Sequence, residues 1–494
     1  MYSTMYTPSM KIIPLPRSIE KLGGSIGPFK GIILVIKSDV LKPILHVLKK
    51  DLKNLADIQV MDENLINPGD LIGVNTTTIS LEIKDGFKEE EHEITIDKDI
   101  SIEGGSYKAV TQGLSTIYQV IKNVSENGAS FPRVKIKDSP FASYRGLLVD
   151  LARKKHKMKT LYKIVDMCRW YKLNHLHLHL TDKPAFTFPS KKYPMLPTKG
   201  HHFKWEELVD LERYATERGI TIMPEMDVPG HARSMIKAMP ETFKLNGEIS
   251  NDVTINMGKE KVYEVIDDLI GELCEVFTST PWIHLGADEV PFKGIDTDPD
   301  CHKYMKDGEI KSVEELYRHF ITRLNEMVRK HGKTLCIWEG FRPEGEIEIP
   351  KDIIVFEFES LYNLADNLAR EGYTLVNTSW LPLYVTPFRH WTAEEIFKWN
   401  MFQWRNWTKS SPATKKPIQL KTDARVLGAQ VCSWEQKDKP EITSLRRRIA
   451  AMVERTWSVV KENADQAPSE EEVTNFLERL EFLDAKLDKL LKNS

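Results

Sequence analysis

The sequence predicts a (β/α)₈ TIM barrel, preceded by an N-terminal α/β accessory domain and followed by a C-terminal helical extension. Eight apolar, strand-like runs begin near residues 144, 174, 219, 282, 333, 352, 373 and 425. Helical segments separate these runs, which together cover about 300 residues, the usual size of such a barrel. Buried parallel strands read as continuous apolar runs, so this rhythm favours a parallel barrel over an antiparallel sheet.

The region before the barrel has the pattern of a separate unit, residues 1–138. Short strand-like runs at 32–37 and 79–86 are followed, over 92–121, by two strands, a Gly-Gly turn and an amphipathic helix. The barrel is expected over residues 139–465 and a final helix over 466–494. That helix follows a Ser-x-x-Glu capping box, Ser469 to Glu472.

Composition limits the classes of partner. The 494 residues include 69 basic and 72 acidic side chains, a net charge of −3, which gives no electrostatic reason to expect nucleic acid or an anionic membrane. A small molecule or a neutral polymer fits better. The five scattered cysteines form no CxxC pair and are expected to be free thiols, mostly buried. The sequence shows no signal peptide, so we expect a cytoplasmic protein or one from which a leader was removed.

Polar side chains gather where the apolar runs end. A barrel carries its chemistry at the carboxyl ends of its strands, and a purely structural barrel has little use for many acids and tryptophans at one rim. The pattern therefore indicates an enzyme. The residues concerned are Arg145, Asp150, Asp182, Glu225, Asp227, Asp288, Glu289, Trp338, Glu339, Glu357, Glu359, Trp434 and Glu435.

Asp288 and Glu289 stand next to each other after the run WIHLG. Neighbouring residues of a strand point to opposite faces. The usual glycosidase arrangement needs two carboxyl groups about 5 to 9.5 Å apart across the bond that is cleaved, and a sequential pair suits it poorly. The pair is therefore either a surface feature or part of a different chemistry.

Histidines raise the alternative of a metal-dependent hydrolase. His175, His177 and His179 share one face of a strand, as metal ligands can. The sequence has no HExxH motif, and a hydrogen-bonded barrel lining is the favoured explanation for His175 and His177. His231 follows the Pro-Gly turn of PEMDVPGH, and Asp182 ends the preceding strand. An Asp-His pair beside a carboxylic acid can orient that acid and tune its pKa.

Tryptophans indicate the substrate class. Trp338, Trp380 and Trp434 follow the fifth, seventh and eighth runs, and more aromatic residues fill the connection before the last run. Aromatic rings at a barrel rim suit the apolar faces of sugars, while charged side chains bind the hydroxyl groups. Core packing is the alternative for the later aromatic group.

The segments YRGLLVDLAR, LNHLHLHLTD, MPEMDVPGH, HLGADE and GAQVCSW closely resemble, in order and spacing, the family 20 glycoside hydrolases, which are exo-acting β-N-acetylhexosaminidases. The N-terminal unit, with GGSYKAVTQGLSTIYQ, resembles the accessory domain of that family. The resemblance implies a retaining mechanism in which the substrate's own 2-acetamido oxygen is the nucleophile and forms an oxazolinium intermediate. It implies that Glu289 is the acid and then the base, that Asp288 stabilises the acetamido group, and that Asp182 and His231 support Glu289.

The resemblance also implies contacts to the sugar. Arg145 would bind the hydroxyl groups at C3 and C4, and Tyr384 would donate its hydroxyl to the acetamido oxygen. The expected wall of the pocket consists of Trp338, Trp380 and Trp434. The sequence departs from the family pattern at three motifs, where it reads Asp182-Lys183-Pro184, Tyr384-Val385-Thr386 and Trp434-Glu435-Gln436 in place of Asp-Asp-Gln, Tyr-x-Asp and Trp-x-Glu. Either Glu435 or Gln436 would therefore bind the C4 and C6 hydroxyl groups.

The leading interpretation is thus a β-N-acetylhexosaminidase that needs no metal and no cofactor and acts on an oligosaccharide or glycoconjugate with a terminal β-linked N-acetylhexosamine. The alternatives are a metal-dependent TIM-barrel hydrolase and a non-catalytic carbohydrate-binding barrel. The second alternative would keep the tryptophans but has no need of the Asp288-Glu289 pair. The sequence leaves open the preference between GlcNAc and GalNAc, the natural linkage, and whether the protein forms a homodimer.

Overall fold

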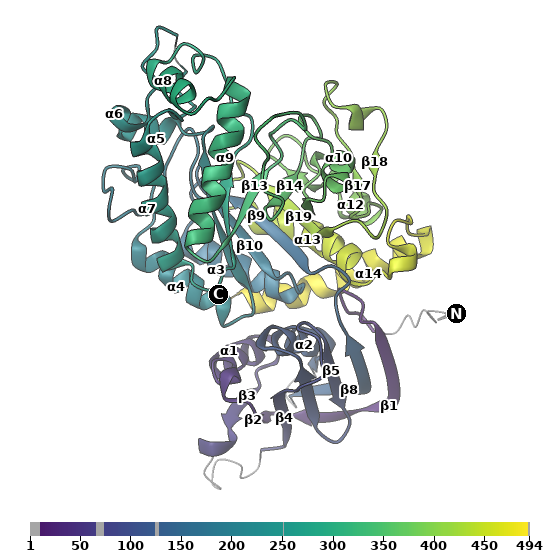
Figure 1. Ribbon diagram of the computed structural model, residues 1–494. Helices are drawn as coiled ribbons and strands as arrows, with labels where there is room; N and C mark the ends of the chain where they lie inside the picture. Colours follow the sequence, from purple (N-terminus) through teal and green to yellow (C-terminus); the bar gives the residue numbers. More distant parts are fainter. Residues whose placement is uncertain (1–9, 66–73, 124–127, 250, 493–494) are drawn as a thin grey trace.

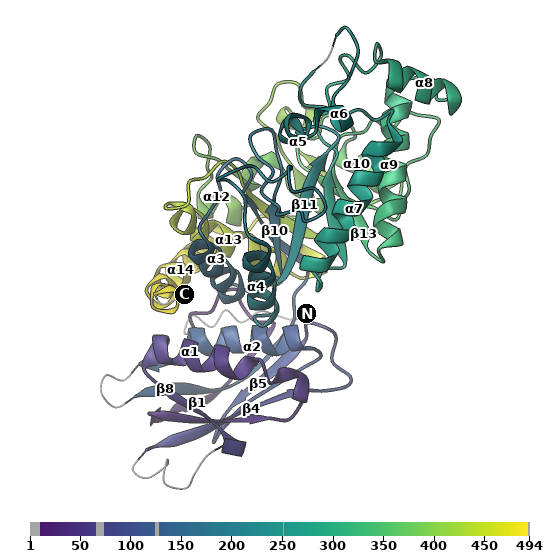
Figure 2. The same ribbon diagram turned by 90° about the vertical axis from the view of Figure 1, so that its left-hand side faces the viewer.

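The computed structural model describes residues 10–65, 74–123, 128–249 and 251–492. It consists of a barrel and a smaller, separate sheet that lies below the barrel in Figure 1. Two helices of the smaller unit, α1 (Ile44–Ala56) and α2 (Tyr107–Val120), lie between its sheet and the barrel (Figure 2). Among the described residues, no helix is both long and apolar enough to span a bilayer.

The smaller sheet is mixed, with the strand order β1-β8-β5-β6-β4-β2-β3, and β7 pairs with β8. Its alternating burial leaves one face for α1 and α2, which cover it. On their other side α2 packs against the barrel helix α3 (Met158–Trp170) and α1 against the C-terminal helix α14 (Glu470–Leu491). The strands are β1 (Ser18–Phe29), β2 (Gly31–Ile36), β3 (Gln59–Asp62), β4 (Thr76–Ile83), β5 (His92–Ile96), β6 (Ile100–Gly104), β7 (Lys122–Asn123) and β8 (Ala129–Asp138).

The barrel contains eight parallel strands in the order β15-β14-β13-β12-β11-β10-β9-β19, and the pairing of β15 with β19 closes the ring. Each corresponds to one predicted apolar run, so the predicted barrel is confirmed. Its strands are almost wholly buried because the ring packs its interior and helices cover its outside. They are β9 (Tyr144–Asp150), β10 (His175–His179), β11 (Thr221–Val228), β12 (Trp282–Gly286), β13 (Thr334–Trp338), β14 (Ile354–Glu357), β15 (Thr374–Asn377) and β19 (Val426–Ser433).

Helices connect most of these strands and continue past the last one. The longer ones are α3 (Met158–Trp170), α4 (Trp205–Thr216), α7 (Glu260–Val276), α9 (Val313–Lys330), α13 (Glu441–Trp457) and α14 (Glu470–Leu491). The shorter helices are α5 (Arg233–Ala238), α6 (Pro240–Phe243), α8 (Pro299–Asp307), α10 (Ala365–Arg370), α11 (Trp380–Leu383) and α12 (Ala393–Phe397). The short strands β16 (Tyr384–Val385), β17 (Gln403–Trp404) and β18 (Ile418–Gln419) lie in the long connection before β19. Ser469 and Glu472 form the predicted capping box at the start of α14.

The expected helix between β13 and β14 does not form: residues 339–353 are irregular. This segment contains Pro343 and Pro350, which lack the backbone N–H that a helix interior requires. Arg318 of α9 holds the segment instead, since its guanidinium donates to the carbonyl oxygens of Arg342 and Ile347 at 2.8 and 2.6 Å.

All five cysteines are free. Cys168, Cys301, Cys336 and Cys432 are buried, and Cys274 is half-buried. The prediction of free, mostly buried thiols is confirmed.

Candidate active site

Three successive strand ends bring Asp182, His231 and Glu289 together, since these residues follow β10, β11 and β12. His231 Nδ1 lies 3.3 Å from Asp182 Oδ1, and His231 Nε2 lies 3.2 Å from Glu289 Oε2. The same Nε2 is 3.6 Å from Asp288 Oδ2. Residues 49 to 58 positions apart in the sequence therefore form one hydrogen-bonded group at the carboxyl end of the barrel.

The backbone explains how two adjacent carboxyl groups reach one imidazole. Ala287 and Glu289 have φ of 71° and 44°, so the chain leaves β12 in the left-handed region and strand alternation no longer applies. His231, with φ of 52°, is also left-handed. Such conformations cost free energy in residues other than glycine and are concentrated at functional sites. Tyr317 of α9 supports this turn by donating its hydroxyl to the carbonyl oxygen of Ala287.

The two carboxyl groups differ in environment. The Asp288 side chain is 13% exposed and the Glu289 side chain 44% exposed. Burial raises the pKa of Asp288 to about 6, against the attraction of His231. The hydrogen bond with His231 lowers the pKa of Glu289. Adjacent residues thus have pKa values displaced in opposite directions, which is typical of carboxyl groups with different catalytic roles.

His231 is protonated at neutral pH. Burial alone would lower the pKa of its imidazole, but Asp227 and Asp288 outweigh burial and raise the pKa to about 12. Asp182 stays ionised, because hydrogen bonds from His179 and His231 hold its pKa well below the usual value despite burial. The site therefore has a fixed positive charge beside the pair Asp288 and Glu289.

The arginine at this site is Arg153. Its guanidinium lies 2.6 Å from Asp182 Oδ2 and 3.0 Å from Asp150 Oδ2, and it packs over the ring of Trp434 at 5.2 Å. The sequence analysis missed Arg153, although it follows the end of β9 by three residues in the segment LVDLAR. A position just after a strand's carboxyl end was the available signal.

The prediction for Arg145 is wrong. Arg145 is the second residue of β9 and lies at the amino end of the barrel, opposite the site. It is fully buried and makes a two-pronged ion pair with Glu90 of the smaller unit, at 2.9 and 2.8 Å. Its Nε also donates to the carbonyl oxygen of Lys172 at 3.0 Å. No part of this guanidinium can reach a ligand at the carboxyl end, since the length of the barrel separates the two.

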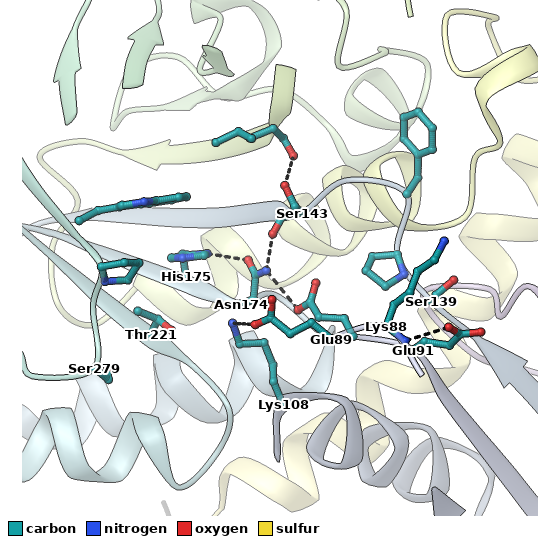
Figure 3. Close-up of a pocket in the computed structure, with 16 residues that line it drawn as sticks. Lys88, Glu89, Glu91, Lys108, Ser139, Ser143, Asn174, His175, Thr221 and Ser279 are labelled. Atoms are coloured by element: carbon teal, nitrogen blue, oxygen red, sulfur yellow. Dashed lines mark hydrogen bonds and ion pairs between the residues drawn. The ribbon is translucent and has the colours of Figure 1, made fainter. Parts of the chain in front are cut away.

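A cavity of about 580 Å³ lies at this amino end, between the smaller unit and the barrel (Figure 3). The buried polar groups between Glu90 and His175 are already paired. Asn174 Nδ2 donates to the carbonyl oxygen of Ser143 at 2.7 Å and to Glu90 at 3.2 Å, and Asn174 Oδ1 lies 2.7 Å from the ring of His175. These paired groups offer little to a polar ligand, and the unpaired buried atoms described below lie at the other end of the barrel, so we place the chemistry there.

The predicted aromatic wall forms beside the carboxyl groups. Ring centroids of Trp338 and Tyr384 lie 5.9 Å from that of Trp434, and Trp380 lies 5.9 Å from Tyr384. Phe358 completes the group, 5.7 Å from Trp338 and 5.9 Å from Trp380. Sequence analysis missed Phe358 because it follows β14 in the run IIVFEF, where it reads as ordinary core.

Several buried polar atoms of this wall and of the neighbouring carboxyl groups have no hydrogen-bonding partner in the part of the chain that the structure describes. They include Trp380 Nε1, Trp434 Nε1 and Asp288 Oδ1. Unpaired buried polar atoms are costly, and they indicate the donors and acceptors that a bound ligand supplies. The arrangement suits a ligand with an amide N–H to donate to Asp288 and several oxygen atoms.

The histidines of β10 serve different partners. His179 lies 2.6 Å from Glu225 and 3.0 Å from Asp182, and His175 is hydrogen-bonded to Asn174. His177, Glu225 and His284 stand close enough to hold a metal ion, within 4.8 Å. Glu225 is already occupied, however, since Trp338 Nε1 donates to it at 2.5 Å and His179 contacts its other oxygen. This geometry favours a hydrogen-bonded barrel lining.

The two motifs that depart from the family pattern at the rim have distinct positions. Thr386 Oγ1 accepts from the backbone N–H of Arg389 at 2.9 Å and so caps a surface turn. The Glu435 carboxylate lies 4.0 Å from Arg153 Nε, and its side chain is 52% exposed. Gln436 is buried. Of the two candidates for hydroxyl binding, only Glu435 thus has its side chain beside Arg153 at the open rim.

Comparisons with known proteins find relatives for both units of the chain. The family model described as glycosyl hydrolase family 20, catalytic domain, matches residues 142–460, and that described as domain 2 of the same family matches residues 9–139. A beta-hexosaminidase of Vibrio furnissii is 25% identical over 462 residues, 86% of this chain and 72% of that protein. A beta-hexosaminidase of Porphyromonas gingivalis is 29% identical over 360 residues, 68% of this chain, and the match spans 46% of that protein's length.

Solved structures show the same fold. The exo beta-N-acetylglucosaminidase of Vibrio harveyi, determined in complex with N-acetylglucosamine, superposes with a TM-score of 0.78 at 24% identity, covering 97% of this chain and 77% of that one. The beta-N-acetylhexosaminidase of Bacteroides fragilis gives the same TM-score at 21% identity and covers 96% of both chains.

Proposed function

The chain belongs to glycosyl hydrolase family 20, and from this premise we propose that it is a retaining, exo-acting β-N-acetylhexosaminidase. Its substrate is a glycan with a terminal β-linked GlcNAc or GalNAc. The observation that carries the proposal is the placement of Asp288 and Glu289 on one protonated histidine, His231, beside an aromatic wall. Neighbouring carboxyl groups suit a reaction whose nucleophile belongs to the substrate.

In the first step, the carbonyl oxygen of the 2-acetamido group attacks the anomeric carbon as the bond to the leaving oxygen breaks. Glu289 gives its proton to that oxygen, and the sugar becomes an oxazolinium ion. Asp288 accepts the N–H of the acetamido group and stabilises the positive charge that develops there. In the second step, Glu289 takes a proton from water, the water oxygen attacks the anomeric carbon, and the acetamido group is restored with net retention. Holding the nucleophile within the substrate supplies the advantage of an intramolecular reaction.

Glu289 must be protonated for the first step, whereas in the free protein the hydrogen bond with His231 favours the ionised carboxylate of Glu289. A bound sugar covers the exposed part of the Glu289 side chain and removes the water that solvates the carboxylate. Such desolvation raises the pKa of a carboxyl group. Substrate binding therefore shifts Glu289 toward the acid form, and His231 favours the carboxylate again once the proton has left.

The remaining side chains orient the sugar. Arg153 presents a planar guanidinium suited to two neighbouring hydroxyl groups, and Glu435 beside it accepts from another. Tyr384 lies in the aromatic wall, and its burial keeps the pKa of the phenol well above the usual value, so it remains a hydrogen-bond donor. In the proposed mechanism it donates to the acetamido oxygen.

Hydrolysis of three p-nitrophenyl β-glycosides tests this function. We expect release of nitrophenol from the GlcNAc and GalNAc derivatives and a rate on the glucoside at least about 10³-fold lower, since glucose lacks the internal nucleophile. Added chelator should leave the rates unchanged, whereas a metal-dependent hydrolase would lose activity. A barrel that only binds carbohydrate would release nitrophenol from none of the three, and equal rates on glucoside and GlcNAc derivative would contradict the acetamido mechanism.

The opposite positions of the two arginines give a paired prediction. Arg145→Ala removes one partner of a buried ion pair and should lower the free energy of unfolding by about 3–5 kcal/mol, with little change in KM of the folded enzyme.

Arg153→Lys keeps the charge but loses the planar fork of the guanidinium and should lower kcat/KM by about 10-fold or more. Denaturant unfolding and steady-state kinetics measure the two effects. Loss of sugar binding in folded Arg145→Ala would show that Arg145 does bind the sugar hydroxyl groups.

A further inference from the structure

Glu359 is a buried carboxyl group at the site for which the proposed mechanism has no role. It follows the end of β14 by two residues and is only 5% exposed. Its Oε1 meets no hydrogen-bond donor among the described residues. A buried polar atom in this state carries a desolvation cost that a ligand can relieve.

The charges that act on Glu359 are those of other acids at the site. Burial, followed by the repulsion of Glu339, Glu289 and Asp288, raises the pKa of Glu359 to about 9. Tyr362 and Tyr384 also lie within electrostatic range of this carboxyl group, and both are neutral phenols. At neutral pH Glu359 is thus an un-ionised acid, which can both donate and accept a hydrogen bond.

The position of Glu359 is fixed by the long connection before β19. Asn406 Nδ2 donates to the carbonyl oxygen of Glu359 at 2.5 Å, and Ser411 Oγ donates to that of Ser360 at 2.9 Å. Trp404 Nε1 holds the carbonyl oxygen of Glu357 at 3.1 Å. Three donors therefore hold three backbone positions of one short turn, as expected for a residue whose side chain is presented to a ligand.

The turn follows the carboxyl end of β14, at the same end of the barrel as the catalytic pair. Of that pair, Glu289 has the more exposed side chain, at 44% against 13% for Asp288. In an exo-acting enzyme the terminal sugar fills the closed part of the site, so the leaving group extends over the acid toward solvent. Glu359 and the half-buried Tyr362 lie within electrostatic range of both carboxyl groups, and Phe358, next to Glu359 in the chain, belongs to the aromatic wall. A buried carboxyl group with an unpaired oxygen at this rim can meet a leaving group that extends over Glu289.

We propose that Glu359 is a specificity-determining residue that hydrogen-bonds a hydroxyl group of the leaving sugar. The proposal rests on the function given above and narrows its substrate class: the natural leaving group is a saccharide, and an aglycone without hydroxyl groups leaves Glu359 unpaired. Thr386, which stands where the family pattern has an Asp, does not supply this contact, because its hydroxyl caps a turn.

Kinetics of Glu359→Ala and Glu359→Gln on two substrates test the proposal. For N,N′-diacetylchitobiose, we expect kcat/KM of Glu359→Ala to fall about 10-fold or more, mainly through KM, as for one lost hydrogen bond. For p-nitrophenyl β-GlcNAc, whose leaving group has no hydroxyl, the change should stay within about 2-fold. Glu359→Gln retains a donor and an acceptor and should restore most of the chitobiose activity. Glu371→Gln is the matched control, because Glu371 lies between β14 and β15 like Glu359 but stands at the end of α10, outside the site.

Inhibition by GlcNAc-thiazoline separates the possible outcomes. This compound mimics the oxazolinium ion and has no leaving group, so its Ki should be the same for wild type and both Glu359 variants. Equal losses on the two substrates, or weaker thiazoline binding in Glu359→Ala, would overturn the proposal and indicate a structural role or a contact to the terminal sugar. A Gln variant as impaired as the Ala variant would also overturn it. If the wild type failed to cleave either substrate, the proposed function itself would fail, independently of Glu359.

Discussion

Glu289→Gln is expected to lower kcat on N,N′-diacetylchitobiose by about 10²–10⁴-fold, the usual contribution of a general acid. The leaving alkoxide of a sugar needs a proton as the bond breaks, and the amide of glutamine cannot give one. The Gln side chain is close in shape to the acid, so the contact to His231 and the aromatic wall are kept. Steady-state kinetics on a series of leaving groups measures the effect.

The size of the loss should depend on the leaving group. A dinitrophenolate leaves without protonation, so we expect the first step with 2,4-dinitrophenyl β-GlcNAc to be slowed far less than with chitobiose. GlcNAc-thiazoline should bind the variant nearly as well as the wild type, which shows that the site is intact. An equal loss on both leaving groups would argue against the acid role of Glu289. The second step also uses this residue, as the base, so pre-steady-state measurement of the first step gives the sharper comparison.

The barrel was predictable because its signal is strong and local. Each parallel strand is buried on both faces, so each appears as a continuous apolar run, and all eight runs became strands. The association of Asp182, His231 and Glu289 was predictable for the same reason. Carboxyl ends of parallel strands meet at one rim, so residues just after the runs come together whatever their separation in sequence.

The errors arose where the apolar run was recognised but the direction of its strand, or the turn that follows the strand, was not. Arg145 belongs to the run YRGLLVDL, but it stands at the start of the strand, and its side chain serves the contact between the two units. Arg153 stands after the end of the same strand and was overlooked. Phe358, also overlooked, lies in a turn whose carbonyl oxygens, at Glu357, Glu359 and Ser360, accept hydrogen bonds from residues about 50 positions later, from Trp404 to Ser411. Such long-range contacts leave no periodic pattern in the sequence.

Asp288→Asn should lower kcat by about 10²–10³-fold, as for the loss of one preorganised group that stabilises transition-state charge. The positive charge of the oxazolinium ion develops on the nitrogen that Asp288 faces, and a neutral amide cannot balance it. This loss should be similar for sugar and nitrophenyl leaving groups, in contrast to Glu289→Gln. GlcNAc-thiazoline should bind the variant much more weakly, and its Ki measures this directly.

The pH profile supplies an independent check. The pKa of Asp288 is raised to about 6, so the group is ionised above that pH and neutral below it. In the substrate complex, where desolvation favours the acid form of Glu289, protonation of Asp288 should make wild-type kcat decline at acid pH, and this acidic decline should be absent or displaced in Asp288→Asn. Because its pKa is raised in the folded state, ionised Asp288 makes the fold less stable at pH 7 than at pH 4. The melting temperature of Asp288→Asn at pH 7 should therefore equal or exceed that of the wild type. An inactive variant with a lower melting temperature would point to damaged folding, and an unchanged acidic decline would assign it to another group.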